Sequence, residues 1–84
     1  MSDATYEGYA NYETWNVALW INNTETLYRN ARWFMDNNPD KNNPYIAFML
    51  NQNMTHMVTP DNVEYMGDTL NFEELNSMMR DLVD

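Results

Sequence analysis

The sequence predicts an all-α fold, a compact bundle of three to four short helices. Apolar residues recur at three- and four-residue spacing along residues 27–35 and 72–83, as they do on the buried face of a helix. Asparagine capping signals precede these two segments and a third one. The chain has 84 residues, 44% of them hydrophobic, which suits one small domain over residues 1–84 rather than a disordered tail. Residues 1–10 lack a clear periodicity, which leaves open a flexible N-terminal arm.

Residues 12–21 can be interpreted in two ways. At a spacing of two, their apolar side chains share one face, as in a strand; at 100° per residue, apolar groups surround nearly the whole cylinder, as in a short buried helix. We favour the helix because a clear helix follows almost at once, and short helix–helix connections are common. If residues 14–21 form a strand instead, the fold class becomes α+β. The simplest role of Trp15, Leu19 and Trp20 is in the core.

The second helix is the clearest element of the sequence. Asn22 and Glu25 have the spacing of a capping box, in which each side chain accepts from the backbone N–H of the other residue. The helix ends before Pro39, whose ring cannot continue it. Its core stripe consists of Leu27, Tyr28, Ala31, Phe34 and Met35. Trp33 falls outside this stripe, among polar residues.

A third helix begins at Asn43-Pro44, an N-cap followed by proline at the first helical position. We expect this helix to continue until Thr59-Pro60 stops it. Tyr45 and Phe48 are expected to lean away from its apolar side. That side consists of Ile46, Met49, Leu50 and Met54, and the sequence leaves open whether Met57 joins them.

Residues 61–70 show no helical pattern and contain at most a short extended piece. The last helix begins with Asn71 as its N-cap, and Glu74 three residues later completes a second capping box. Glu73 and Glu74 also suit the positive end of the helix dipole. The core stripe of this helix consists of Phe72, Leu75, Met79, Leu82 and Val83.

The chain carries a formal net charge of −9, which is unevenly distributed. Residues 1–28 contain four acids and no Lys or Arg, and residues 60–84 contain seven acids and one Arg, whereas residues 29–59 contain three bases and two acids. Direct binding to nucleic acid is disfavoured, because such proteins cluster Lys and Arg to displace counterions from phosphates. A basic protein partner is compatible with this charge.

The signatures of enzymes and metal sites are missing from the sequence. There is no cysteine, and His56 is the single imidazole, so neither a thiolate site nor a pair of histidine ligands can form within one chain. The two glycines fit neither a phosphate-binding loop nor a nucleophile elbow. Adjacent acids such as Glu73 and Glu74 are explained by the helix terminus rather than by acid–base catalysis. The sequence therefore predicts a protein that is not an enzyme and uses no cofactor.

The compartment is predicted from the same features. No stretch approaches the roughly 20 apolar residues of a membrane span, and the first residues lack the basic and apolar regions of a signal peptide. A small secreted domain usually depends on disulfides, which this chain cannot form. We therefore expect a cytoplasmic protein with no membrane partner.

Residues 11–23 form the motif NYETWNVALWINN, which is followed by Glu25 and the pair Leu27-Tyr28. This motif resembles the pattern NYETWxVxLWIxN of a family of small uncharacterised proteins, many of them encoded by bacteriophages. The resemblance is strong over residues 11–36 and loose elsewhere. It implies a helical fold and a phage origin, in which case the compartment is the cytoplasm of the host cell, and it implies no particular activity.

We expect a non-enzymatic protein-interaction module, a phage accessory protein that binds and modulates a host protein. Trp, Tyr and Arg dominate the hot spots of protein interfaces, and Trp33 lies off the apolar stripe of its helix. The expected contact residues are Tyr6, Tyr9, Arg29, Arg32, Trp33, Glu73, Glu74 and Asp81. The alternative for Trp33 is burial under the N-terminal arm.

The charge also suggests a second function, an acidic DNA mimic that occupies the cationic groove of a restriction, CRISPR or transcription protein. Duplex DNA carries one charge per ~1.7 Å of its axis. Thirteen acids, partly neutralised by four bases, fall short of that density if they are spread over all sides. This alternative therefore requires that the acids of residues 60–84 and of the N-terminus converge, or that the protein forms a dimer. A third hypothesis is that the protein is a structural component of a phage that forms homo-oligomers.

Overall fold

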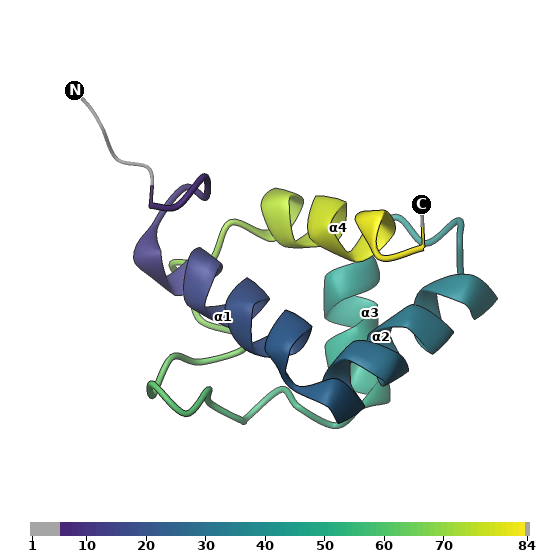
Figure 1. Cartoon of the computed structure of the whole chain (residues 1–84), viewed down its shortest axis with the longest axis horizontal. Coiled ribbons are helices and arrows are strands. Elements are labelled where there is room, and N and C mark those ends of the chain that lie inside the picture. The colour runs from purple at the N-terminus through teal and green to yellow at the C-terminus, as the bar shows by residue number, and fades with distance from the viewer. Residues whose placement is uncertain (1–5, 84) are drawn as a thin grey trace.

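A computed structural model describes residues 6–83 as four α-helices joined by irregular segments (Figure 1). The helices are α1 (Tyr12–Asn23), α2 (Glu25–Asn37), α3 (Pro44–Asn51) and α4 (Phe72–Asp81). The predicted small helical bundle is confirmed, and residues 14–21 are helical rather than extended. The molecule measures 39 × 24 × 21 Å along its principal axes.

One residue, Thr24, separates α1 from α2. It has extended backbone angles (φ −99°, ψ 109°) and ends the first helix as it begins the second. The predicted capping role of Asn22 is therefore wrong. Asn22 lies inside α1, where its Nδ2 donates to the carbonyl of Ala18 at 2.8 Å. α1 continues past this residue to Asn23.

The core draws on all four helices and on the long segment between α3 and α4. In α2 the predicted stripe is confirmed in its second half, where Ala31, Phe34 and Met35 are buried. The segment between α3 and α4 contributes Met54, Val63, Tyr65 and Leu70. The core therefore depends on residues that belong to no helix.

The buried face of α1 differs from the expected one. Val17 and Ile21 are fully buried, four residues apart, as helical spacing requires. Trp15, Leu19 and Trp20 are half-buried and lie at the margin of the core rather than within it. The two indoles at this margin contact other aromatic rings and polar groups, which are described below.

The buried face of α3 is shifted by about one residue along the sequence relative to the predicted face. Tyr45 and Phe48 are fully buried, whereas Leu50 is 65% exposed. α3 packs against both α2 and α4, so its inner face is covered from two sides. The ring of Phe48 packs on Phe34 of α2, with 5.6 Å between centroids, and the ring of Tyr45 packs on Phe72 of α4, at 6.0 Å. Two aromatic neighbours thus decide which face of α3 is buried.

α3 also ends earlier than expected. Its last residue is Asn51, and Asn53 adopts a left-handed backbone conformation (φ +58°), which asparagine tolerates. The N–H of Asn53 donates to Leu50 O at 3.2 Å, and that of Met54 donates to Met49 O at 2.9 Å. This is a Schellman motif, which terminates the helix eight residues before the predicted stop. Met54 stays in the core, whereas Met57 is 51% exposed.

A partly buried hydrogen-bond network holds the segment before α4 against α1. Asn16, which is fully buried, accepts from the Thr59 hydroxyl at 2.7 Å and donates from Nδ2 to the Asp61 carboxylate at 2.8 Å. Trp20 donates its indole N–H to the same carboxylate oxygen at 2.8 Å. We call these four residues the Asn16 network. Within the described residues the backbone of this segment forms one isolated antiparallel bridge, between Val58 and Glu64, and the side chains of the network join the segment to α1.

The first turns of α1 and α4 are also bonded to each other. Asn71 caps α4 by accepting from the N–H of Glu74 at 3.0 Å, which confirms the forward half of the predicted capping box. The N–H of Asn71 donates to Thr14 of α1 at 2.9 Å instead of to Glu74. The carboxylate of Glu74 accepts from the backbone N–H of Ala10 at 2.7 Å. In a complete capping box the N–H of Asn71 would donate to the carboxylate of Glu74. Here the N–H bonds to α1 and the carboxylate bonds to the backbone that precedes α1, so both groups connect the starts of the two helices.

We expect Asn16→Ala to lower the free energy of unfolding by about 1–3 kcal/mol, because it leaves the buried Thr59 hydroxyl without its acceptor. Urea unfolding monitored by circular dichroism measures this difference. Asn23→Ala, at an exposed position of the same helix, is the control, with an expected change within about 0.5 kcal/mol. Equal unfolding midpoints for Asn16→Ala and the control would contradict the role of the network.

The Asn16 network also makes stability depend on pH. Hydrogen bonds from Asn16 and Trp20 lower the pKa of Asp61, against a smaller opposing effect of burial. A carboxyl with a lowered folded-state pKa contributes stability above its unfolded pKa of about 3.9 and loses it as the pH falls through the folded value. We expect Asp61→Asn to be less stable than wild type at neutral pH and to lose less stability on acidification. Urea midpoints measured from neutral pH into the acid range, with the exposed Asp40→Asn as control, test this; an acid dependence equal to wild type contradicts it.

Candidate interaction surfaces

A groove between α2 and α3 is flanked by two exposed apolar side chains, Trp33 and Leu50, which we call the Trp33–Leu50 patch. Trp33 is 62% exposed and Leu50 is 65% exposed. The groove has a volume of about 510 Å³, and its lining residues are Trp33, Phe34, Asn38, Lys41, Ala47, Leu50 and Asn51. Because Ala31, Phe34 and Met35 direct α2 into the core, Trp33 is directed outward. Lys41 is the one charged residue of the lining.

The two arginines that were expected to flank Trp33 are both exposed on α2 and interact with their own helix. Arg29 forms an ion pair with Glu25 at 2.6 Å. The guanidinium of Arg32 lies 6.0 Å from the centre of the Tyr28 ring, within range of a cation–π contact. The structure thus places these cations on the helix that carries Trp33, with partners of their own.

Tyr6 and Tyr9 lie away from Trp33. They close a tight turn in which each backbone N–H donates to the carbonyl of the other residue, at 2.6 and 2.8 Å. Glu7 and Gly8 occupy the two central positions with positive φ (+51° and +90°), as a type I′ turn requires. This turn precedes α1, whose start lies at the end of the molecule opposite to the end of α2 (Figure 1). The structure therefore does not bring the two tyrosines and Trp33 into one surface, nor do the described residues bury Trp33.

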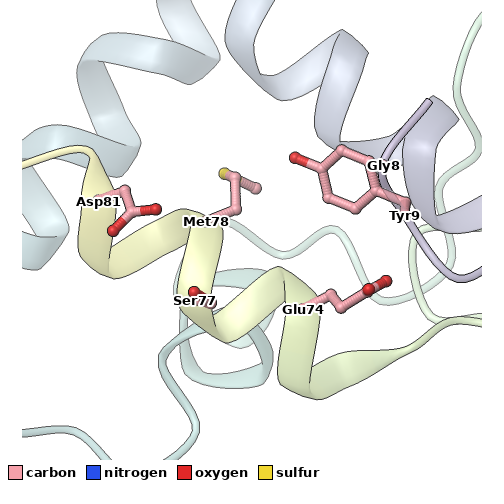
Figure 2. Close-up of a pocket in the computed structure, with 6 residues that line it drawn as sticks. All are labelled: Gly8, Tyr9, Glu74, Ser77, Met78 and Asp81. Atoms are coloured by element: carbon pink, nitrogen blue, oxygen red, sulfur yellow. The ribbon is translucent and has the colours of Figure 1, made fainter.

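Three of the expected contact residues, Tyr9, Glu74 and Asp81, line the same pocket. Figure 2 shows Tyr9 facing α4, which presents Glu74 and Asp81 along the same pocket. The pocket has a volume of about 250 Å³ and is completed by Gly8, Ser77 and Met78. Burial and the two carboxylates raise the pKa of the Tyr9 hydroxyl. Glu73, the remaining acid of the prediction, is exposed on α4.

Five acids from the two terminal thirds of the chain lie around the first half of α1 or the backbone that precedes it. Glu13 of α1 lines a groove of about 360 Å³ together with Glu64 and Asp68. Asp61 is bonded to α1 through the Asn16 network, and Glu74 is bonded to the backbone that precedes α1. We call this region the acidic end and define it by Glu13, Asp61, Glu64, Asp68 and Glu74. The sequence could not decide this convergence, because it depends on contacts across more than 40 residues of chain.

The sequence-based prediction missed two residues of these surfaces, Leu50 and Asp61. Leu50 was assigned to the core, although the spacing of Tyr45, Phe48 and Met49 equally describes a helical face. Asp61 was interpreted as part of an irregular loop, and no local pattern links it to Asn16. A lone acid after proline carries no signal of its tertiary partner.

Features of a metal centre are absent from the part of the chain that is described. Within residues 6–83, no three His, Asp or Glu side chains lie close enough together to hold a metal ion. His56 is exposed and lines a pocket together with Met57 and Glu64. None of the helices in this range is both long enough and apolar enough to cross a membrane.

Fold and surface together define a small helical-bundle protein with an exposed apolar patch on α2 and α3 and a group of acids around the first half of α1. Residues 2–84 match a family of unknown function, DUF7249, and the chain belongs to this family. The prediction that the chain belongs to a family of uncharacterised proteins is therefore confirmed. No curated protein and no solved structure matches the chain.

Proposed function

We propose that this protein is a non-enzymatic interaction module that binds a host protein through the Trp33–Leu50 patch. The observation that carries the proposal is the exposure of Trp33 and Leu50 on facing helices, on either side of one groove. Tryptophan is the residue most enriched in binding hot spots, where a large side chain meets a pocket on the partner. Exposed apolar residues that cluster, rather than occurring singly, are a mark of interaction sites.

The surroundings of the patch favour an apolar contact over a charged one. Buried Phe34 and half-buried Ala47 line the groove, and the amides of Asn38 and Asn51 contribute polar groups to its lining. This arrangement of an apolar centre and a polar rim is that of a protein-binding surface. Binding here should depend little on salt, because burial of apolar area is not screened by ions.

The biological setting follows from the sequence features. The chain contains no cysteine, which suits a reducing cytoplasm. The NYETW motif of residues 11–15 resembles that of phage-encoded proteins. We therefore place this protein, as part of the same proposal, among phage accessory proteins that modulate a protein in the host cytoplasm.

We expect Trp33→Ala to abolish capture of a host protein from lysate while leaving the helical content unchanged. Affinity capture at about 50 and 500 mM salt, followed by mass spectrometry, measures the partner; circular dichroism measures the fold. Met57→Ala, at another half-exposed apolar side chain outside the groove, should capture as wild type does. Undiminished capture of the same partner by Trp33→Ala contradicts this assignment.

A second candidate function is supported by the acidic end. Glu13, Glu64 and Asp68 line one groove, which supports the convergence of acids that a DNA mimic requires. The match is local rather than complete: duplex DNA as long as the 39 Å axis carries about 23 charges, whereas the chain has thirteen acids. The acidic end would therefore replace a short stretch of phosphates in the cationic groove of a DNA-binding protein.

If this second function holds, the captured partner is released at about 500 mM salt and displaced by duplex DNA, because both act on the same charges. The variant Glu64→Gln/Asp68→Asn should weaken capture. The variant Asp36→Asn/Asp40→Asn, which removes two acids of α2 and its following loop, should not. A partner that withstands both salt and DNA competition is bound by another surface.

A further inference from the structure

Three aromatic rings form a contiguous surface beside the acidic end. Tyr6 packs against Tyr12 and Trp15, with ring centroids 5.3 and 4.9 Å apart, and Tyr12 lies 5.7 Å from Trp15. We call these three residues the Tyr12 cluster. Tyr6 is 41% exposed and Tyr12 is 38% exposed. The rings touch one another, so no ligand fits between them, and only their outer faces are available.

Carboxylates border these rings. The Nδ2 group of Asn16 donates both to the Tyr12 hydroxyl, at 3.3 Å, and to the Asp61 carboxylate, at 2.8 Å, which places the phenol beside the acid. Glu13 follows Tyr12 in the first turn of α1. Desolvation is the main cause of the raised pKa of Tyr12, and the charges of Asp61 and Glu13 add to it. The cluster therefore lies in a negative potential.

Among the described residues, the segments that form this face carry no Lys, Arg or His side chain to neutralise the negative potential. Residues 1–28 and 60–79 contain no Lys, Arg or His. The ion pair found among residues 6–83 joins Arg29 to Glu25 on α2. A cation that occupies the face must therefore come from another molecule. A second copy of this chain is a poor candidate, because a net charge of −9 opposes its approach.

We propose that the Tyr12 cluster and its bordering carboxylates bind arginine side chains of a basic segment in a partner protein. The inference rests on the second proposed function, in which the acidic end contacts a basic protein, and names the chemistry of recognition. A guanidinium is planar and weakly hydrated, so it stacks on aromatic faces and pairs with a carboxylate through two parallel N–H bonds. A lysine ammonium is a compact, strongly hydrated charge that gains less from the rings. Arginine is therefore preferred over lysine at equal charge.

The test compares two peptides, six arginines and six lysines, titrated into the ¹⁵N-labelled full chain. The indole N–H signals of the three tryptophans act as local probes: Trp15 lies in the cluster, Trp20 bonds to Asp61, and Trp33 lies on the other surface. We expect the arginine peptide to shift the Trp15 and Trp20 signals, to leave Trp33 unchanged and to bind about fivefold more tightly than the lysine peptide. Equal affinities, or shifts confined to Trp33, overturn the inference.

Variants separate the contribution of the rings from that of charge. Tyr12→Leu removes the central ring and should bring the two peptides to the same affinity while retaining the binding of lysine. Tyr28→Leu, which removes a ring of α2 beneath Arg32, is the matched control and should keep the preference for arginine. A preference that survives in Tyr12→Leu overturns the inference, and the wild-type comparison decides the question even if that variant fails to fold.

The failures of the two proposals can be told apart. If both peptides bind at the acidic end with equal affinity, the arginine inference is wrong and the contact with a basic protein stands. If neither peptide moves the Trp15 or Trp20 signal, the acidic end does not take basic segments, and both proposals are overturned.

Discussion

The buried side chain of Asn16 holds the longest non-helical segment of the described chain against α1. One amide satisfies the hydroxyl of Thr59 and the carboxylate of Asp61, which are 43 and 45 residues away in sequence. Twenty residues lie between α3 and α4, and they supply Val63, Tyr65 and other members of the core. If this segment were not held against α1, the core residues that it contributes would not be held in place. The bundle thus depends on a polar contact as much as on apolar packing.

The same contact links stability to the surfaces at one end of the molecule. Trp20 and Asn16 hold Asp61 beside Tyr12, while Glu74 holds the backbone before α1. These bonds gather carboxylates around exposed aromatic rings, although like charges repel. Directed hydrogen bonds to Asp61 and Glu74 offset part of that repulsion. A structural network and a charged, aromatic contact surface therefore share residues, so variants of Asn16 or Asp61 affect both.

The Trp33–Leu50 patch is built on different elements and has a different chemical character. It is apolar, it lies between α2 and α3, and a single lysine supplies its charge. The acidic end and the Tyr12 cluster lie where α1 begins, at the other end of the long axis (Figure 1). If both surfaces bind partners as proposed, salt weakens binding at the acidic end and has little effect at the patch, because ions screen charges and leave apolar burial intact.

Local signals in the sequence located the four helices, the starts of α3 at Pro44 and of α4 after Asn71, and the position of Trp33 off the core stripe, because caps and apolar stripes act within a few residues. The sequence could not decide which face of α3 is buried, since the stripes that include Tyr45 or Leu50 are both helical. That choice was made by aromatic neighbours on α2 and α4. Only the tertiary structure brought Asp61 to Asn16 and gathered the acids at one end, because these contacts join residues that no local pattern relates.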